Sequence, residues 1–322
     1  MLKPIVSAML FAALACSAQV RSSQKPAAAN TQQVLWQKLE AAIADSDRTL
    51  DGVLGVAIED LTTGQKFLLH ENEVFPQASS IKIAVLAELY HQAQLSAEGQ
   101  SGKARLTDLY TVQPSDLVAD SDIMLGLTPS VTRLTNRDLA TMMVAVSDNS
   151  AANVLIDRVG MENVNALMDS LGLSHTRLRR KMMDLKAASE GRENISTPRE
   201  MMILLEALYR GRVLNKEMTE GFLKMLSTHK ESIIARILPE GVRAATKWGA
   251  LEGVRNDSGI VFAQNRPFLI CLMTTYLHNE KDGEEAIMHI AAIAYRMFDR
   301  LGRASEYGRV VSPNDSSGPS TR

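Results

Sequence analysis

A serine and a lysine three residues apart, Ser79 and Lys82, are the first pair in this sequence whose spacing could support chemistry. In a helix, side chains at this spacing share a face about 5–6 Å apart, so the Lys82 amine could reach the Ser79 hydroxyl. A serine becomes a good nucleophile only when a neighbouring base takes its proton. The same spacing recurs at Ser22 and Lys25, where it has no catalytic meaning. At Ser79, however, an apolar helix follows, in which a lysine is costly unless it has a polar task.

Two further short motifs carry polar side chains that could act with this pair. The first is the run Ser147, Asp148 and Asn149, which on its own is best explained as a turn between two helices with a polar N-cap. The second begins at Lys247 and continues through Trp248, Gly249 and Ala250, and on its own it indicates the end of a strand. The combination of all three motifs, in this order, indicates a catalytic site more strongly than any one of them alone.

The elements that must position these motifs follow from hydrophobic spacing. We expect helices over residues 34–44, 79–94, 136–146, 150–159, 198–209 and 283–301. We expect strands over residues 53–61, 66–70, 244–248, 258–264 and 267–276. Strands at both ends of the chain with helices between them predict an α/β (α+β) fold, in which an antiparallel sheet is flanked by helices and an all-helical lobe is inserted. We expect the active site in the cleft between the sheet and this lobe.

The composition excludes several classes of protein. The chain has 322 residues, of which 45% are hydrophobic and 22% charged, as in an ordinary soluble globular protein. A formal net charge of -2 argues against nucleic acid as a partner. The two cysteines, Cys16 and Cys271, and the six histidines show no metal-ligand spacing, so we expect no metal.

The start of the chain predicts export. Residues 1–18 combine Lys3, an apolar run and small residues, which is the pattern of a signal peptide. Residues 13–16 also resemble a lipobox, so Cys16 is either removed with the leader or kept as a lipid-anchored N-terminus. The apolar run is too short for a membrane span, and we expect none in the mature protein. The expected location is the periplasm, or the outer envelope as a lipoprotein.

The sequence predicts one catalytic domain between flexible terminal segments. Residues 19–31 are predicted to be a flexible tether and residues 304–322 a disordered tail, because both are rich in small and polar residues. The domain itself would span residues 32–303 as a monomer. Its sheet lobe would comprise about 32–78 and 235–303, and its helical lobe about 79–234.

From about residue 34 to residue 301 the sequence resembles the class A β-lactamase-like, penicillin-recognising serine hydrolases. The resemblance implies that Ser79 is the acylated nucleophile, with Lys82 as its base or part of its proton relay. It implies that Ser147 passes a proton to the leaving nitrogen and that Lys247 adds positive charge for a substrate carboxylate.

The same resemblance assigns the groups that bind substrate. Asn149 would hydrogen-bond the substrate's side-chain amide, and the backbone N–H groups of Ser79 and Ala250 would form the oxyanion hole. Gly249 would leave room for the substrate. The implied substrate is a β-lactam or an acyl-D-Ala-D-Ala-like peptide, and no cofactor is implied.

One departure from the family lies in residues 177–197, which resemble its Ω loop. In class A β-lactamases this loop carries a glutamate that activates the deacylating water. Counting back without gaps from Thr197 and Pro198 puts Lys181 at that position, and Asp184 is the nearest acid. A lysine cannot act as a base at neutral pH unless its pKa is strongly lowered. Without a base, the acyl-enzyme formed with a β-lactam should persist.

The other departure is Trp248, which stands where the family usually has threonine or serine to contact the substrate carboxylate. The indole is larger and donates a single N–H. Arg255 is one candidate for the missing contact, and turn chemistry around residues 255–257 is an equal explanation of that arginine.

Three functions remain open at this point. The first is a β-lactamase that opens β-lactam amides through Ser79. The second is a D-Ala-D-Ala carboxypeptidase-like or esterase-like penicillin-binding protein that deacylates β-lactams slowly. The third is a non-catalytic penicillin-binding or sensing module on the same fold.

Overall fold

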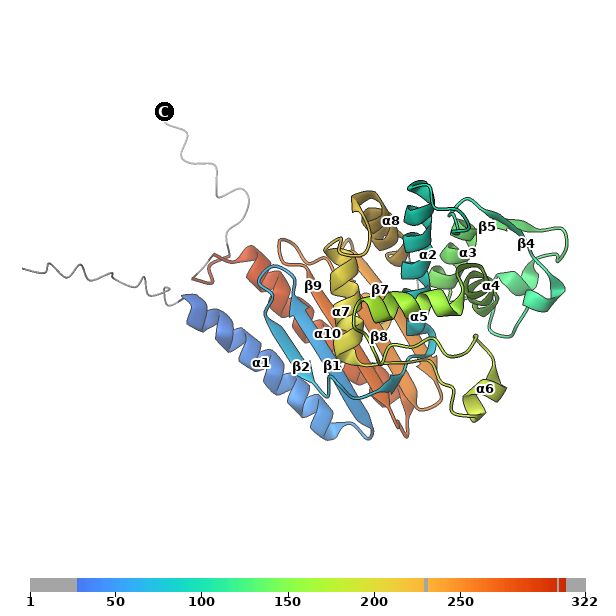
Figure 1. The fold of residues 1–322 in the computed structure, drawn as a ribbon. Coiled ribbons are helices and arrows are strands. Elements are labelled where there is room, and N and C mark those ends of the chain that lie inside the picture. The colour runs from blue at the N-terminus through green and yellow to red at the C-terminus, as the bar shows by residue number, and fades with distance from the viewer. Residues whose placement is uncertain (1–27, 229–230, 306, 311–322) are drawn as a thin grey trace, which may run out of the picture.

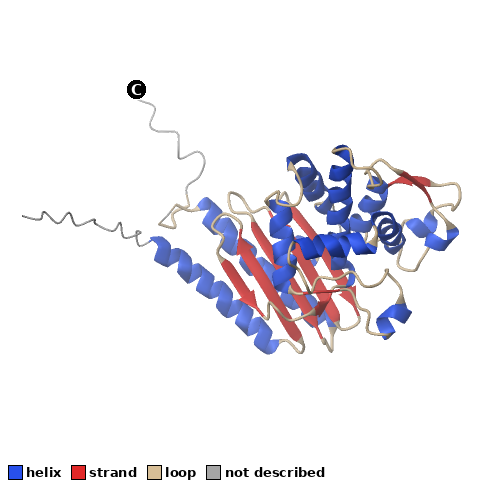
Figure 2. Cartoon of the chain, in the orientation of Figure 1, coloured by secondary structure: helices blue, strands red, loops and turns tan. Residues whose placement is uncertain are grey.

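A five-stranded antiparallel sheet lies at the centre of the computed structural model, which describes residues 28–228, 231–305 and 307–310 (Figures 1 and 2). Its strands run in the order β2-β1-β9-β8-β7. Their bounds are β1 Val53–Asp60, β2 Lys66–Leu69, β7 Ala244–Leu251, β8 Val254–Val261 and β9 Phe268–Thr275. The sheet is therefore assembled from both ends of the chain, as the sequence predicts. β7, which carries the Lys247 motif, is an edge strand.

Helices cover both faces of the sheet (Figure 1). α1 (Ala28–Thr49) and α10 (Glu280–Arg303) pack together over one face, where the Trp36 and Phe298 rings meet edge to face at 5.6 Å. α7 (Pro198–Tyr209) packs on the other face against β1 and β9. Thr197 caps α7 by accepting from the Glu200 N–H, as its sequence position predicts. α7 thus covers the sheet, although its residues fall within the range that we expected for the helical lobe.

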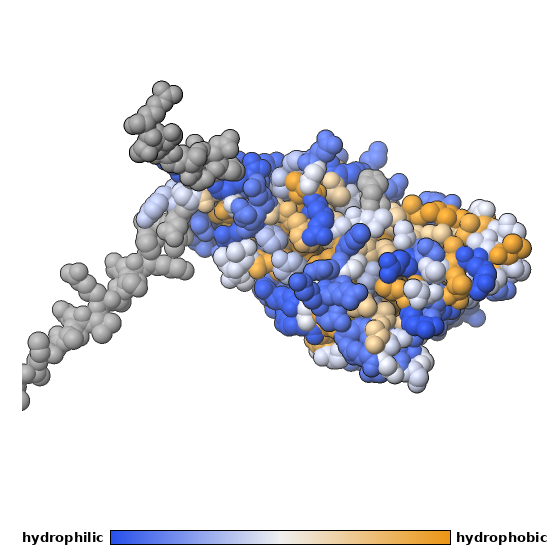
Figure 3. All heavy atoms as spheres, turned by 90° about the horizontal axis from the view of Figure 1, so that it is seen from above, coloured by the Kyte–Doolittle hydropathy of each residue, from blue (hydrophilic) through white to orange (hydrophobic). Residues whose placement is uncertain are grey.

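The remaining helices gather around α2 (Lys82–Ala97), which is buried along most of its length. Its neighbours are α3 Asn136–Ala145, α4 Asn149–Val159, α5 Met161–Ser170 and α8 Lys216–Leu226. Short elements complete the described fold: β3 Phe75–Pro76, η1 Ala78–Ile81, β4 Leu109–Thr111, η2 Pro114–Asp116, η3 Met124–Gly126, β5 Arg133–Thr135, α6 Leu185–Ser189, β6 Ile195–Ser196 and α9 Ile233–Arg236. The β4–β5 ribbon and its loops lie at the end of the molecule away from α1, where apolar and polar residues alternate on the surface (Figure 3).

Two of the sequence expectations are wrong at the ends of elements. Residues 28–31, expected to belong to the tether, form the start of α1. Residues 255–257, for which we weighed a turn, lie inside β8. The hairpin turns earlier, between Leu251 and Val254, where Gly253 has a φ of 68° that suits glycine. The sequence did not predict this part of β8, because Asn256 and Asp257 are polar although they are fully buried in the strand.

The expected leader, with Lys3 and Cys16, lies outside the described residues. Within the parts of the chain that the structure describes, no helix is both long and apolar enough to cross a membrane.

The close contact between β8 and β7 at Gly259 yields a stability prediction. A Cβ atom on Gly259 would lie 2.1 Å from the Ala245 carbonyl oxygen and 2.5 Å from the Thr246 Cα, both of which are backbone atoms. Gly259→Ala should therefore destabilise the protein by about 3 kcal/mol, because overpacked backbone cannot move aside cheaply. Gly126→Ala is the matched control, since nothing lies within 4 Å of its added Cβ. Thermal unfolding that is unchanged in Gly259→Ala would contradict this account of the sheet.

Candidate active site

Ser79 lies in η1, the short 3-10 helix that leads into α2, and it is half-buried. Several contacts fix this segment. The Ser80 hydroxyl donates to the Gln77 carbonyl at 2.6 Å, and the Gln77 N–H donates to the Asn194 carbonyl at 2.8 Å. On β7, a Cβ atom at Gly249 would lie 2.7 Å from the Gln77 carbonyl oxygen and 2.8 Å from the Ser79 nitrogen. Gly249 is therefore needed for the packing of β7 against the nucleophile segment, beyond the room for substrate that we expected.

The Lys82 amine is fully buried one turn away from Ser79. It donates to the Ser147 carbonyl at 2.6 Å, to the Ser147 hydroxyl at 3.1 Å and to the Asn149 side-chain oxygen at 2.8 Å. The spacing of Ser79 and Lys82 suggested a direct hydrogen bond between them, whereas the hydrogen bonds of this amine run to the Ser147 motif. Lys82 thus joins the first motif to the second.

The Ser147 motif forms the turn between α3 and α4. Ser147 itself has a φ of 59°, a conformation that is uncommon for a residue with a side chain. The buried Asp148 carboxylate holds this turn: it accepts from the Ala151 N–H at the start of α4 and from the Ile123 and Met124 N–H groups. Asp148 therefore holds the position of the turn, and the N-cap explanation of the motif is confirmed.

Lys247, also fully buried, brings the third motif to the same hydroxyl. Its amine donates to the Ser147 hydroxyl at 3.0 Å and to the Trp248 carbonyl at 2.9 Å. Burial lowers the pKa of the Lys82 ammonium well below its usual value, and the charge of Lys247 lowers it further, while Asp148 and Asp120 act in the opposite direction. The arrangement favours a neutral Lys82, which is the form that can take a proton; with two N–H groups, the neutral amine donates to only two of its three neighbours at a time.

A small cavity of about 100 Å³ opens at Ser79. Ala250 and Asn149 line it together with Ser79. Sequence reasoning missed its other polar lining residues: Asp120, Arg180 and Asn194. They lie in loops and match no motif that we singled out. Arg180 is buried and pairs with Glu193 at 2.7 Å.

The structure does not place Lys181 at this cavity, which corrects our placement of the Ω-loop position. The Lys181 amine turns away and pairs with Asp157 at 2.7 Å on the surface. Met182 and Met183 line the cavity instead. Asn153 fixes this register, because its side chain accepts from the Met182 N–H at 2.8 Å and donates to the Met182 carbonyl at 3.0 Å. Ungapped counting from the end of the loop cannot detect such a contact.

Asp184 does not take the place of the missing acid in this structure. Its carboxylate caps α6 by accepting from the Ala187 N–H at 2.9 Å, and Asp184 is exposed. It is not among the residues that line the cavity at Ser79.

Arg255 and Trp248 also lie differently from our expectation for a carboxylate contact. The Arg255 guanidinium donates to Glu284 of α10 at 3.0 Å and to the carbonyls of Leu251 and Val254, so it joins the β7–β8 hairpin to α10. Trp248 lines a separate small cavity with Val146 and other residues. Lys247, by contrast, lies beside the Ser147 hydroxyl.

Among the described residues no group of three histidine, cysteine, aspartate or glutamate side chains could hold a metal ion. The chemistry that these residues can perform is acyl transfer: a serine nucleophile, a buried amine of lowered pKa, and a second hydroxyl shared by two amines.

Comparison with known proteins agrees with this geometry. A profile described as the β-lactamase enzyme family matches residues 35–298. β-Lactamase SME-1 from Serratia marcescens is 27% identical over 263 residues, which cover 79% of this chain and 86% of that protein. The crystal structure of a β-lactamase from Sphaerobacter thermophilus superposes with a TM-score of 0.72 at 31% identity, covering 81% of this chain and 97% of the other.

The structure of PBP-A is similar in fold, with a TM-score of 0.71 at 23% identity over 84% of this chain and 97% of that chain. The family profile spans most of the chain, and the three motifs that carry the resemblance meet at one hydroxyl in the structure. The chain therefore belongs to the class A β-lactamase-like family of serine hydrolases.

Proposed function

We propose that this protein opens β-lactam amides by acylation of Ser79 and releases the acyl group slowly. One observation carries this proposal: the amines and hydroxyl needed for acylation are assembled, while the Ω-loop wall of the same cavity is Met182 and Met183. Its natural substrate would be an acyl-D-Ala-D-Ala-like peptide or a related ester, as in the carboxypeptidase-like alternative that the sequence left open.

Acylation can be written as a closed set of proton transfers. Neutral Lys82 takes the proton of the Ser79 hydroxyl as its oxygen attacks the carbonyl carbon. The backbone N–H groups of Ser79 and Ala250 stabilise the oxyanion. The Ser147 hydroxyl gives its proton to the leaving nitrogen and is reprotonated by Lys82, whose ammonium form, made by taking the Ser79 proton, lies 3.1 Å from it. Overall, one proton moves from Ser79 to the leaving nitrogen and Lys82 returns to its neutral form.

Asn149 and Lys247 would orient the substrate during this step. The Asn149 side-chain oxygen is used by Lys82, which leaves its amide group as the donor toward the acyl amide of the substrate. Lys247 lies beside the Ser147 hydroxyl, where its charge would attract a substrate carboxylate, and the same charge lowers the pKa of Lys82.

Deacylation needs a water molecule activated by a base. Thioether side chains cannot accept a proton from water, so Met182 and Met183 offer no base, and the Asp184 carboxylate is engaged in capping α6. Slow release follows from this wall of the cavity rather than from any defect in the acylating groups.

A turning-over β-lactamase is the second candidate, and Asp120 favours it. Asp120 lines the cavity at Ser79, and its carboxylate is a possible base for the deacylating water. Asp120 is exposed, and its backbone carbonyl accepts from the Asn149 N–H at 3.4 Å.

We also propose that the protein acts outside the cytoplasm. The support is the sequence of residues 1–18, which leaves both a cleaved leader and a lipid anchor at Cys16 open.

The lifetime of the acyl-enzyme separates these functions. After addition of benzylpenicillin, intact mass should show one adduct that forms rapidly and persists, and Ser79→Ala should form none. Met182→Glu should shorten the lifetime by about 10²-fold, because it places a carboxylate at the cavity wall. Asp184→Asn is the matched control and should leave the lifetime within about twofold, since that carboxylate lies outside the cavity.

Other outcomes are equally decisive. An adduct that disappears as fast as it forms in the wild-type protein contradicts slow release and supports the β-lactamase, above all if Asp120→Asn then prolongs it. A folded protein that forms no adduct with any β-lactam or ester supports the sensing module instead.

The lowered pKa of Lys82 predicts the pH dependence of acylation. Only neutral Lys82 can take the serine proton, so the second-order rate constant should rise with pH through the pKa of Lys82, at a pH below the ordinary lysine value of 10.5. Lys247→Met removes a positive charge that lowers this pKa, so the rising limb should move to higher pH even though the rate itself falls. Lys247→Arg keeps the charge and should keep the limb near its wild-type position.

The rate constant is measured by mass spectrometry at short times over a series of pH values. A limb that stays in place or moves to lower pH in Lys247→Met would contradict the role assigned to the two amines.

A further inference from the structure

A small cavity lies around the side chain of Trp248, beside the residues that would serve the leaving nitrogen. Its volume is about 70 Å³, and four separate segments of the chain line it: Asp122, Ala145 with Val146, Glu231 and Trp248. Pockets that hold a complete ligand are several times larger, so this size suits one substituent of a ligand bound at Ser79. We call it the Trp248 cavity.

The strand β7 places the Trp248 side chain on the same face as Ala250. Side chains two residues apart on a strand point to the same face of the sheet, about 7 Å from each other. Ala250 lines the cavity at Ser79. The Trp248 ring therefore lies on the face of β7 that borders the catalytic cavity, two residues before Ala250.

Hydrogen bonds connect the Trp248 cavity with the group that would protonate the leaving nitrogen. The Lys247 amine donates to the Ser147 hydroxyl at 3.0 Å and to the Trp248 carbonyl at 2.9 Å. Val146, which lines the cavity, directly precedes Ser147 in the chain. Because Ser147 gives its proton to the leaving nitrogen in the proposed acylation, the leaving group must lie on this side of the reacting carbonyl.

Two carboxylates accompany the aromatic ring in the Trp248 cavity. Asp122 and Glu231 are both exposed, and Trp248 is half-buried. Neither acid forms an ion pair with another residue that the structure describes, and no lysine or arginine is among the described residues that line the cavity. The face of an indole ring attracts positive charge, and nearby carboxylates add to that attraction. The chemistry of this cavity therefore suits a cation.

The backbone beside each carboxylate is fixed to the site. Ile123, which follows the first acid, donates its N–H to the Asp148 carboxylate at 3.1 Å. Ser232, which follows the second, donates its hydroxyl to the Asp257 carboxylate at 2.6 Å. Asp257 lies opposite Trp248 in the β7–β8 pairing. The fold thus holds the segments that carry both acids against the Ser147 turn and β8.

We propose that Trp248 determines which leaving groups the site accepts, because its ring receives a cationic substituent of the leaving group while Asp122 and Glu231 supply the counter-charge. The inference rests on the proposed acylation of Ser79 and adds the class of leaving group. That group carries an aromatic or quaternary ammonium substituent beyond the carboxylate that Lys247 attracts. Contact with the ring face needs no N–H donor on the ligand, so a fully substituted nitrogen fits.

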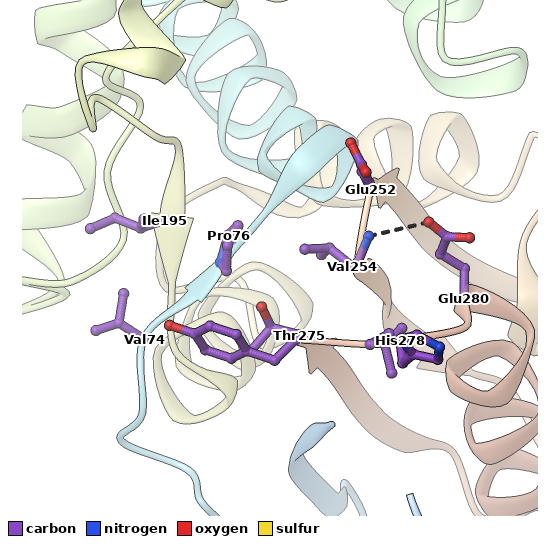
Figure 4. A pocket seen from close by; sticks show the side chains of 11 residues that line it. Val74, Pro76, Ile195, Glu252, Val254, Thr275, His278 and Glu280 are labelled. Atoms are coloured by element: carbon purple, nitrogen blue, oxygen red, sulfur yellow. Dashed lines mark hydrogen bonds between the residues drawn. The ribbon is translucent and has the colours of Figure 1, made fainter. Parts of the chain in front are cut away.

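Substrates that differ only in the leaving group isolate the Trp248 cavity. A larger cavity of about 610 Å³ lies past the end of β7, at the turn to β8 (Figure 4). It shares no lining residue with the Trp248 cavity. A pair of substrates with one acyl group makes the same contacts elsewhere, so a difference between them reports on the leaving-group side.

Cephalothin and cephaloridine form such a pair. They share a thienylacetyl group and a ring carboxylate, and they differ in a neutral acetoxymethyl or a cationic pyridiniomethyl substituent at C3. The rate constant for acylation of Ser79 is measured by intact mass for each compound, and their ratio is compared between variants so that intrinsic reactivity cancels. The ratio of cephaloridine to cephalothin should fall about fivefold in Trp248→Thr, as expected for loss of a partly exposed cation–π contact.

Further variants separate the ring from the charges. Trp248→Phe keeps an aromatic face and should retain most of the ratio, whereas Asp122→Asn/Glu231→Gln should lower it about threefold. Glu98→Gln, an exposed glutamate at the end of α2, is the matched control and should behave as wild type. A ratio within twofold of wild type in Trp248→Thr would overturn the proposal, and so would an equal loss in Trp248→Phe and Trp248→Thr.

Binding without reaction keeps the two proposals distinguishable. If neither cephalosporin acylates Ser79, the proposed function fails, and the Trp248 cavity is then tested by calorimetric titration of both compounds into the Ser79→Ala protein. Tighter binding of cephaloridine that is lost in Ser79→Ala/Trp248→Thr supports the cation site. Equal binding of the two compounds to Ser79→Ala overturns it.

Discussion

Two buried amines meeting at one hydroxyl are the constraint on which the site depends. Lys82 and Lys247 both donate to the Ser147 hydroxyl, at 3.1 and 3.0 Å, and both are fully buried. Two adjacent ammonium groups in a protein interior repel each other and lose hydration, so one of them is driven toward its neutral form. Lys82 is the amine whose pKa is lowered, and we propose that its neutral form acts as the base for Ser79. The catalytic property therefore comes from the way distant segments pack.

Much of the fold serves to hold this arrangement. α2 carries Lys82 into the interior, the buried Asp148 holds the strained turn at Ser147, and Gly249 lets β7 approach the backbone at Ser79. Acylation and deacylation are then properties of different segments. The first depends on α2, the α3–α4 turn and β7, whereas the second depends on which side chain the Ω loop points into the cavity. In the proposed function, a single residue of that loop, Met182, is therefore expected to govern the lifetime of the acyl-enzyme without affecting its formation.

The sequence predicted those features that depend on local patterns. The bounds of α7 were predicted from its proline and its threonine cap, and the sheet from apolar runs at both ends of the chain. The motif residues Lys82 and Lys247 both contact Ser147 in the structure, whereas the sequence had suggested that Lys82 contacts Ser79. The predictions that failed concern features that depend on contacts between distant residues. Asn153 sets the register of the Ω loop, so that Met182 and not Lys181 faces Ser79. Arg255 lies in β8, and the sequence did not predict this part of the strand because its buried side chains are polar.

Titration of Lys82 itself tests the central claim most directly. In protein labelled with ¹³C at the lysine Cε atoms, NMR should show one signal that titrates well below the ordinary lysine value of 10.5, and Lys82→Met should lack that signal. A Lys82 signal that titrates at or above the ordinary value would contradict the account, because the amine would then be charged and unable to take the proton of Ser79.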